Sequence, residues 1–220
     1  MIKAVLFDLD GTLANTLDDI ADSGNWALEQ CGFPPYPVER YVYFVGSGVK
    51  TLIERMLADY PHTERQYRQV LSLYSDRYQA HSFDKTRPYD GIADLLDNLR
   101  RQRVACAVVS NKPMAGTRQV IERLFQPGSF AYVYGHTEPY APKPAPEAVL
   151  HVLETLGVRP SDCLYIGDTD VDMQTARNAG IVSIGAVWGF RTRAELEENG
   201  AAYLADTPRD VIDLVRRLNG

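Results

Sequence analysis

Ile2-Lys-Ala-Val-Leu-Phe-Asp-Leu-Asp-Gly-Thr-Leu13 is an apolar run that ends abruptly in two aspartates and a glycine. A short, continuous apolar run is typical of a strand that is buried on both faces, as the strands of parallel sheets are. Asp8 and Asp10 would then follow the carboxyl end of this strand. Because open α/β sheets bind ligands beyond the carboxyl ends of their strands, the stretch indicates both a fold class and the edge that carries function.

The remaining sequence shows two kinds of pattern. From about residue 15 to residue 83, apolar side chains recur at helical spacing, whereas after Pro88 apolar runs alternate with helical stripes. The predicted strands cover 104–109, 163–166 and 181–187, and the predicted helices include 38–44, 52–57 and 173–179. The sequence therefore predicts an α/β fold, with a parallel sheet core formed by residues 1–15 and 84–220 and an inserted helical lid at residues 16–83.

Composition narrows the class of protein. In 220 residues, 45% are hydrophobic and 24% are charged, as in an ordinary folded protein. The net charge of -6 opposes non-specific binding to nucleic acid or to anionic lipid. No apolar run is long enough to cross a membrane and no secretory signal is visible, so we expect a cytoplasmic protein. The three cysteines, Cys31, Cys106 and Cys163, stand among apolar neighbours and are expected to be reduced core residues.

Polar side chains follow three of the predicted buried strands. Asp8 and Asp10 follow the first, and Ser110 with Asn111 follows a second, at residues 104–109. Asp168 and Asp172 follow a third strand. These strand ends converge in a parallel sheet, and the repulsion between carboxylates at one edge is costly unless a cation compensates it. All-oxygen ligation of this kind suits Mg²⁺.

Lys143 stands just before a predicted helix and could bring a positive charge to the same edge. Carboxylates, a divalent cation, a hydroxyl and an ammonium group together are typical of a phosphoryl-transfer site, since that chemistry mainly needs positioning and neutralisation of oxygen charge. The expected partner is a small phosphorylated metabolite, handled by a monomer or a homodimer.

Four ordered motifs resemble those of the haloacid dehalogenase superfamily. They are Asp8-Leu-Asp-Gly-Thr-Leu13, Ser110-Asn-Lys112, Lys143-Pro144 and Gly167-Asp-Thr-Asp-Val-Asp172. The resemblance spans most of the chain and implies a Rossmann-like parallel sheet core with a small inserted helical cap. It also implies Mg²⁺-dependent hydrolysis of a phosphomonoester through an aspartyl-phosphate intermediate.

The resemblance implies a role for each matching residue. Asp8 would attack phosphorus and also bind the metal, while Asp10 would protonate the leaving oxygen and then activate water. The other implied roles are metal ligation by Asp168 and by the backbone carbonyl of Asp10, phosphate contact by Ser110, charge neutralisation by Lys143, support of the metal site by Asp172 and Thr12, and substrate contacts by Thr12 and Asn111.

The second aspartate, Asp10, favours phosphomonoester hydrolysis over dehalogenation or phosphonate cleavage, because an ester needs an acid for the departing alcohol and a base for water. Three stretches together are similar to phosphoglycolate phosphatases: residues 44–52 of the cap, residues 187–191 and residues 200–203. Within the first stretch, Gly46, Ser47 and Gly48 would let backbone amides approach a small anionic ligand. A phosphatase for another small metabolite (a sugar phosphate, a nucleotide or pyrophosphate), a phosphosugar mutase and a catalytically silent binding module stay open as alternatives.

Overall fold

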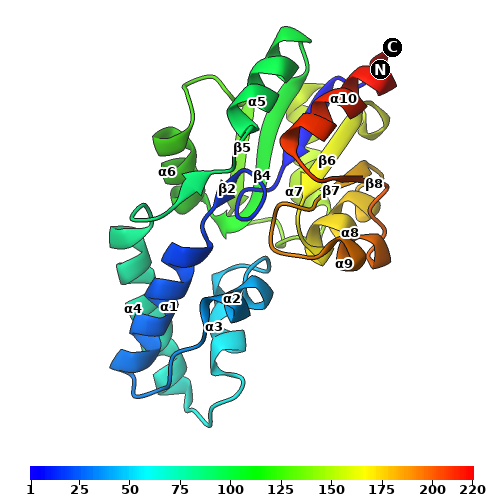
Figure 1. Cartoon of the computed structure of the whole chain (residues 1–220). Helices are drawn as coiled ribbons and strands as arrows, with labels where there is room; N and C mark the ends of the chain where they lie inside the picture. The colour runs from blue at the N-terminus through cyan, green and yellow to red at the C-terminus, as the bar shows by residue number, and fades with distance from the viewer. The chain divides into compact units, whose positions relative to one another are not determined.

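The computed structural model describes all 220 residues. Its contacts divide the chain into two compact units (Figure 1). The sheet unit comprises Met1–Ala14 and Pro88–Gly220, and the helical unit comprises Asn15–Arg87. The chain passes between the units through two short strands, β2 (Ala14–Asn15) and β3 (Arg87–Pro88), which pair with each other.

The sheet unit is built on six parallel strands in the order β5-β4-β1-β6-β7-β8. They are β1 (Ala4–Phe7), β4 (Ala105–Pro113), β5 (Tyr132–His136), β6 (Cys163–Gly167), β7 (Val182–Ala186) and β8 (Tyr203–Ala205). Strand β1 lies in the interior of the sheet, with Val5 paired to Cys106 on one side and to Leu164 on the other. Its central place explains why the opening stretch is apolar throughout, and the predicted parallel α/β fold is confirmed.

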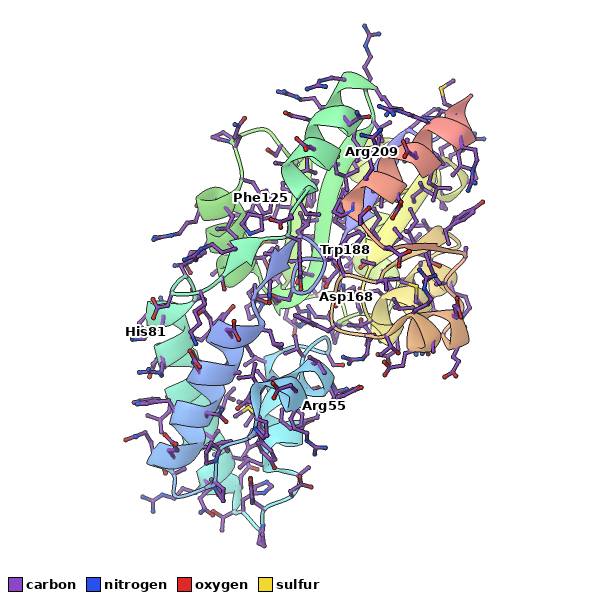
Figure 2. The ribbon with its side chains drawn as sticks, in the orientation of Figure 1. Arg55, His81, Phe125, Asp168, Trp188 and Arg209 are labelled. Carbon is purple, nitrogen blue, oxygen red and sulfur yellow. The ribbon has the colours of Figure 1, made fainter.

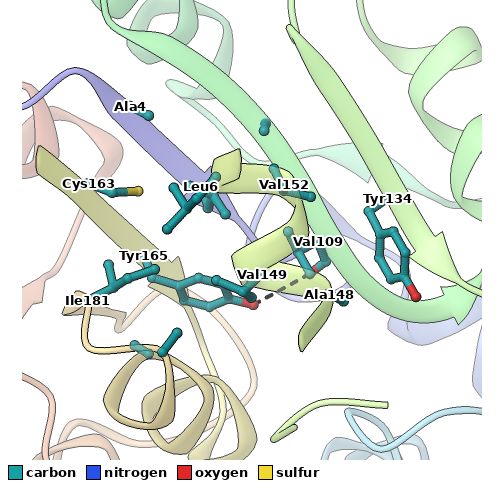
Figure 3. Close-up of a cluster of buried hydrophobic side chains, with 14 residues drawn as sticks. Ala4, Leu6, Val109, Tyr134, Ala148, Val149, Val152, Cys163, Tyr165 and Ile181 are labelled. Carbon is teal, nitrogen blue, oxygen red and sulfur yellow. Dashed lines mark hydrogen bonds between the residues drawn. The ribbon is translucent and has the colours of Figure 1, made fainter. Parts of the chain in front are cut away.

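Helices cover the sheet. They are α5 (Ile92–Arg101), α6 (Met114–Leu124), α7 (Glu147–Leu156), α8 (Asp170–Asn178), α9 (Arg193–Glu198) and α10 (Pro208–Asn219), with one 3-10 turn at Pro160–Asp162. Figure 3 shows the core between the sheet and α7, where Ala4 and Leu6 of β1 pack with Val149 and Val152. Alternate residues of β1 point to the opposite face and are equally buried, so both faces of the sheet are covered.

The helical unit holds four helices: α1 (Leu17–Gln30), α2 (Val38–Phe44), α3 (Val49–Leu57) and α4 (Glu64–His81). Asp19 of α1 ties down the end of the unit by accepting hydrogen bonds from the backbone N–H groups of Lys85 and Thr86 and from the Thr86 hydroxyl. Tyr41 is fully buried and contacts α1 through a hydrogen bond to Asn25. No helix in the structure is long and apolar enough to cross a membrane.

Some local expectations were wrong. Strand β4 continues to Pro113, four residues beyond the predicted end, so Ser110 and Asn111 lie within the strand and not after it. Strands β5 and β8 and helix α9 were not predicted, because their short runs carry polar or aromatic residues that hide the apolar pattern. Cys31 is half-buried at the end of α1 and is not a core residue, whereas Cys106 and Cys163 are buried as expected.

Candidate active site

Three buried carboxylates meet at the carboxyl edge of the sheet. Asp8 directly follows β1, Asp168 directly follows β6, and Asp172 lies in the first turn of α8. Carboxylate oxygens of the three residues all lie within 4.8 Å of one another. Their exposed fractions are 5% or less, so water screens their mutual repulsion poorly. The edge therefore concentrates negative charge in a buried position.

Lys143 brings an ammonium group into this cluster from the segment before α7. Its Nζ lies 2.7 Å from Oδ1 of Asp8 and 2.7 Å from Oδ1 of Asp172. Nζ also donates a hydrogen bond of 3.0 Å to the hydroxyl of Tyr165. Because all three of its donors have partners, this buried lysine is held rigidly beside Asp8.

Asp172 joins the lysine to helix α8. Its Oδ1 accepts from Lys143, while its Oδ2 accepts from the Thr169 hydroxyl at 2.6 Å and from the Thr169 N–H at 3.1 Å. The Thr169 hydroxyl in turn accepts from the Asp172 N–H, which completes the capping box that begins α8. Both oxygens of Asp172 are thus engaged by protein groups, as a supporting residue requires.

Asp168 is held by two further segments of the chain. Its Oδ1 accepts from the Thr12 hydroxyl at 2.8 Å, and its Oδ2 accepts from the Phe190 N–H at 2.8 Å. A Cβ at Gly11 would overlap the Asp168 carboxylate, and a Cβ at Gly189 would overlap its Cβ. These two glycines allow the close approach that fixes the Asp168 side chain.

Trp188 connects the same two segments. Its Nε1 donates a hydrogen bond of 3.0 Å to the carbonyl of Thr12, so the loop after β7 is fastened to the loop after β1. Figure 2 labels Trp188 and Asp168 at this end of the sheet unit. The loop at residues 187–191 therefore stabilises the position of Asp168.

Asp10 is bound by a second lysine. Nζ of Lys112 lies 2.9 Å from Oδ1 and 2.9 Å from Oδ2 of Asp10, and the two side chains are 8% and 12% exposed. Asp8 and Asp10 stand on one loop, yet each has its own ammonium partner. The geometry thus gives the two aspartates different surroundings.

Ser110 and Asn111 fix the neighbouring backbone. The Ser110 hydroxyl accepts a hydrogen bond of 3.2 Å from the N–H of Lys112. The Asn111 amide bonds to the backbone of Lys143 in both directions, accepting from its N–H at 2.7 Å and donating to its carbonyl at 3.1 Å. Asn111 therefore positions the lysine segment, and its expected contact with substrate stays a prediction.

The electrostatics of the cluster follow from its burial. Burial raises the pKa of Asp8 to about 7, although Lys143 opposes the rise, and the charges of Asp172 and Asp10 add to it. Burial also raises the pKa of Asp168 well above its usual range, with Asp172 and Asp8 contributing further. Burial disfavours the charged form of Lys143, yet the carboxylates of Asp172 and Asp8 hold its pKa well above the ordinary value. The site therefore keeps the Lys143 ammonium group charged, while burial disfavours the ionised forms of Asp8 and Asp168.

This set of residues fits a divalent metal ion. Four carboxylates, those of Asp8, Asp10, Asp168 and Asp172, share two lysines, so two positive charges are missing when all the carboxylates are ionised. A hard divalent cation takes oxygen ligands and supplies that charge. Burial, which raises the pKa of both Asp8 and Asp168, adds to the cost of leaving these carboxylates ionised without such a cation.

The segment Gly46-Ser47-Gly48 lies between α2 and α3 of the helical unit. Gly46 and Gly48 have φ angles of 112° and 86°, a backbone region that favours glycine. Arg55 of α3 donates to the carbonyl groups of Tyr43 and Phe44, at 3.0 and 3.1 Å, and to the Ser47 hydroxyl at 3.2 Å. The loop thus has a defined conformation within its own unit, and its contact with substrate stays a prediction.

Sequence reasoning missed several residues of this site. Tyr165 resembles an ordinary core residue of a buried strand, and only the structure shows its hydroxyl beside Lys143. Lys112 stands in the motif Ser110-Asn-Lys112, but the sequence indicates no role for it. Gly189 carried the one usable signal, because it stands three residues after the buried strand β7 and a glycine near a strand end can mark a close approach of the backbone.

Comparison with protein families supplies the class of protein that this fold and site represent. Residues 5–186 match the family described as haloacid dehalogenase-like hydrolase. The chain belongs to this family, as its four motifs predicted.

Individual relatives resemble the chain along nearly its whole length. The phosphoglycolate phosphatase of Pseudomonas putida KT2440 is 33% identical, over 98% of this chain and 78% of the relative. The N-acetylmuramic acid 6-phosphate phosphatase of Pseudomonas aeruginosa PAO1 is 31% identical, over 98% of this chain and 96% of the relative. A crystal structure from Lactobacillus delbrueckii subsp. bulgaricus superposes with a TM-score of 0.92 at 35% identity, covering 97% of this chain and 98% of that one.

Proposed function

We propose that this protein is a Mg²⁺-dependent phosphatase that hydrolyses phosphoglycolate through an aspartyl phosphate on Asp8. One observation carries the proposal. A buried aspartate at the carboxyl edge of a parallel sheet contacts a fixed lysine, while a second aspartate on the same loop is bound separately. That arrangement offers a nucleophile and an acid–base group at one edge, as two-step phosphoryl transfer requires.

Asp8 and Asp168, together with the backbone carbonyl of Asp10, would hold the metal ion. When bound, Mg²⁺ supplies positive charge that neutralises phosphate oxygens and keeps Asp8 ionised. Thr12 would support this set by donating to Asp168, and Asp172 would support it by accepting from Lys143, which also contacts Asp8.

In the first step, a carboxylate oxygen of Asp8 attacks phosphorus and the bond between phosphorus and the leaving oxygen breaks. Asp10, as a carboxylic acid, gives its proton to that oxygen, so the alcohol leaves neutral. Ser110 and Lys143 contact the phosphoryl oxygens and balance their charge. The products of this step are the free alcohol and the acyl phosphate on Asp8.

In the second step, Asp10 is a carboxylate and takes a proton from water as the water oxygen attacks phosphorus. The bond between phosphorus and the Asp8 oxygen breaks, and inorganic phosphate is released. Both aspartates return to their starting states. One residue thus serves as acid and then as base, which requires its carboxyl group to stay close to both oxygens.

The helical unit would act as the cap that selects the substrate, with Gly46, Ser47 and Gly48 contacting the small anionic leaving group. Full-length similarity to the phosphoglycolate phosphatase of Pseudomonas putida supports phosphoglycolate. Similarity to the N-acetylmuramic acid 6-phosphate phosphatase of Pseudomonas aeruginosa supports a larger sugar phosphate as the second candidate. The cytoplasmic location and the monomeric or homodimeric state remain predictions.

A substrate panel tests the proposal. The purified protein with Mg²⁺ should be assayed for phosphate release from phosphoglycolate, N-acetylmuramic acid 6-phosphate and p-nitrophenyl phosphate. We expect the highest kcat/KM with phosphoglycolate. A higher value for the sugar phosphate would overturn the substrate assignment alone, and no release from any phosphoester would overturn the phosphatase itself.

A further inference from the structure

Lys112 is the second lysine of the site, and its ammonium group contacts Asp10 evenly. Both distances from Nζ to the Asp10 carboxylate oxygens are 2.9 Å, which is within the range of charge-assisted hydrogen bonds. The side chains are 8% and 12% exposed, in contrast to the lysine of the surface ion pair Lys3–Asp162, which is 59% exposed. The Lys112–Asp10 contact therefore belongs to the interior of the site.

The backbone of Lys112 is held from two sides. Its N–H donates to the Ser110 hydroxyl, and its carbonyl accepts a hydrogen bond of 3.1 Å from the hydroxyl of Thr117 in α6. The pairing of β4 with β5 is irregular between Ser110 and Pro113. Irregularities of this kind re-aim side chains next to active sites. The strand irregularity and the two hydrogen bonds fix the point from which the lysine reaches Asp10.

The consequence concerns the reach of Asp10. A general acid or base must approach the proton that it transfers to within about 2.6 to 3.2 Å, measured between heavy atoms. A misplacement of about 1 Å can lower the rate on the order of 10²-fold. An ammonium group placed evenly between the two oxygens restricts where the carboxyl group of Asp10 can lie.

We propose that Lys112 is a positioning residue for proton transfer, which holds the Asp10 side chain where it meets the leaving oxygen and the attacking water. The inference rests on the proposed function, since it assigns Lys112 to the acid–base steps of that reaction. Lys112 acts through Asp10 and not through the phosphoryl group, which Lys143 serves. Its effect is therefore largest for substrates whose leaving oxygen needs a proton.

Leaving groups separate this role from a direct contact with substrate. The alkoxide of phosphoglycolate needs a proton to depart, whereas p-nitrophenolate is stable without one. Lys112→Met should lower kcat with phosphoglycolate about 10- to 100-fold, in line with a loss of acid–base positioning, with KM changed less than about 3-fold. With p-nitrophenyl phosphate, the same variant should form phosphoenzyme at nearly the wild-type rate and release phosphate slowly.

A double-mutant cycle tests whether the two residues act as one unit. The variants are Lys112→Met, Asp10→Asn and the double variant, with Lys112→Arg as the conservative change and Lys3→Met as the control for an exposed lysine that pairs with an aspartate. We expect Lys112→Met to add little to Asp10→Asn, less than about 3-fold, and Lys112→Arg to keep more activity than Lys112→Met. Lys3→Met should match the wild type.

Three results would overturn the inference: multiplied losses in the double variant, a loss confined to KM, or wild-type kcat in both Lys112 variants. Circular dichroism melting would show whether each variant folds. If Lys112→Met does not fold, Lys112→Arg is compared with the wild type in its place. An inactive wild type would instead overturn the proposed function. An active wild type with an impaired Asp10→Asn variant and unaffected Lys112 variants would overturn the positioning role alone.

Discussion

Asp8 and Asp10 are two residues apart, yet their surroundings differ. Asp8 is 5% exposed and lies in a network in which Lys143 also contacts Asp172 and Tyr165. Asp10 instead contacts the ammonium group of Lys112. A nucleophile must not move relative to phosphorus, while an acid–base group must serve two different oxygens in turn. The comparison indicates that the site separates attack from proton transfer by giving each aspartate its own support.

Removal of the metal should have the largest effect, because it leaves the carboxylates around Asp8 without compensating charge. EDTA should abolish phosphate release and Mg²⁺ should restore it. Asp168→Ala should weaken Mg²⁺ binding, measured by calorimetry independently of turnover. Calcium should inhibit, since its larger and looser coordination would disturb the alignment of Asp8 with phosphorus. Full activity in EDTA would contradict the metal site.

Asp10→Asn tests the acid–base role of Asp10, in contrast to the nucleophilic role of Asp8. The amide keeps the shape of the side chain but exchanges no proton, so phosphoglycolate turnover should fall on the order of 10² to 10⁴-fold. With p-nitrophenyl phosphate, Asp8 should still be phosphorylated and phosphate should be released slowly. Rapid-quench kinetics would separate the two steps. An equal loss of the phosphorylation step with both substrates would mean that Asp10 does not act as the leaving-group acid.

A further comparison is between the reaction at Asp8 and Asp10 in the sheet unit and the choice of substrate, which we assign to the helical unit. Gly46 and Gly48 have positive φ angles, so a bulky residue at either position strains the loop as well as filling space. Leu at either position should change the ranking of phosphoglycolate against larger phosphates, by about 10-fold or more in relative kcat/KM, because cap loops control access and water exclusion. If small and large phosphates lost activity in equal proportion, the loop would have no role in specificity.

The raised pKa of Asp8 should have a smaller effect, which is a change in the free energy of unfolding with pH. The folded protein keeps a proton on Asp8 up to about pH 7, whereas an unperturbed aspartate loses it near 3.8. Between these values the folded state binds more protons than the unfolded chain, so Asp8 makes the metal-free protein less stable as pH rises. Mg²⁺ competes with those protons, so its stabilising effect should grow over the same range.

Thermal melting at about pH 5 and about pH 8 checks this dependence, and Mg²⁺ should raise the Tm more at the higher pH, by about 2 to 4 °C for each kcal/mol gained. Metal-free Asp8→Asn is the matched control for the pH dependence of the metal-free wild type, because the variant lacks the titrating group and also a proposed metal ligand. In that variant the difference between the two pH values should shrink. An equal Mg²⁺ shift at both pH values in the wild-type protein would contradict the raised pKa of Asp8.

Much of the sheet and its functional edge could be predicted from the sequence because both faces of the central strands are buried. Val5 and Leu6 point to opposite faces and are both fully buried, so the run reads as apolar throughout. Tyr132–His136 did not give this signal, because Tyr132, Val133 and His136 are only partly buried and the strand ends in Gly135 and His136.

Of the site, the sequence could predict only the residues that stand at the ends of buried strands. Asp8 and Asp168 directly follow buried strands, so parallel topology alone brings them together. The pairing of each lysine depends on side-chain direction and on loop contacts with no periodic pattern. The bond from the Phe190 N–H to Asp168 joins residues 22 apart, and the bond from Lys112 to Asp10 joins residues 102 apart. Only the folded chain shows such contacts.

Trapping of the phosphoenzyme tests the central claim most directly. The wild-type protein should be mixed with phosphoglycolate and Mg²⁺, quenched in acid within the first turnover, digested, and analysed by mass spectrometry, with Asp8→Asn as the control. The account predicts one phosphorylated peptide, with the acyl phosphate on Asp8, and no such peptide from the control. An acyl phosphate on any other residue, or turnover without phosphoenzyme, would contradict it.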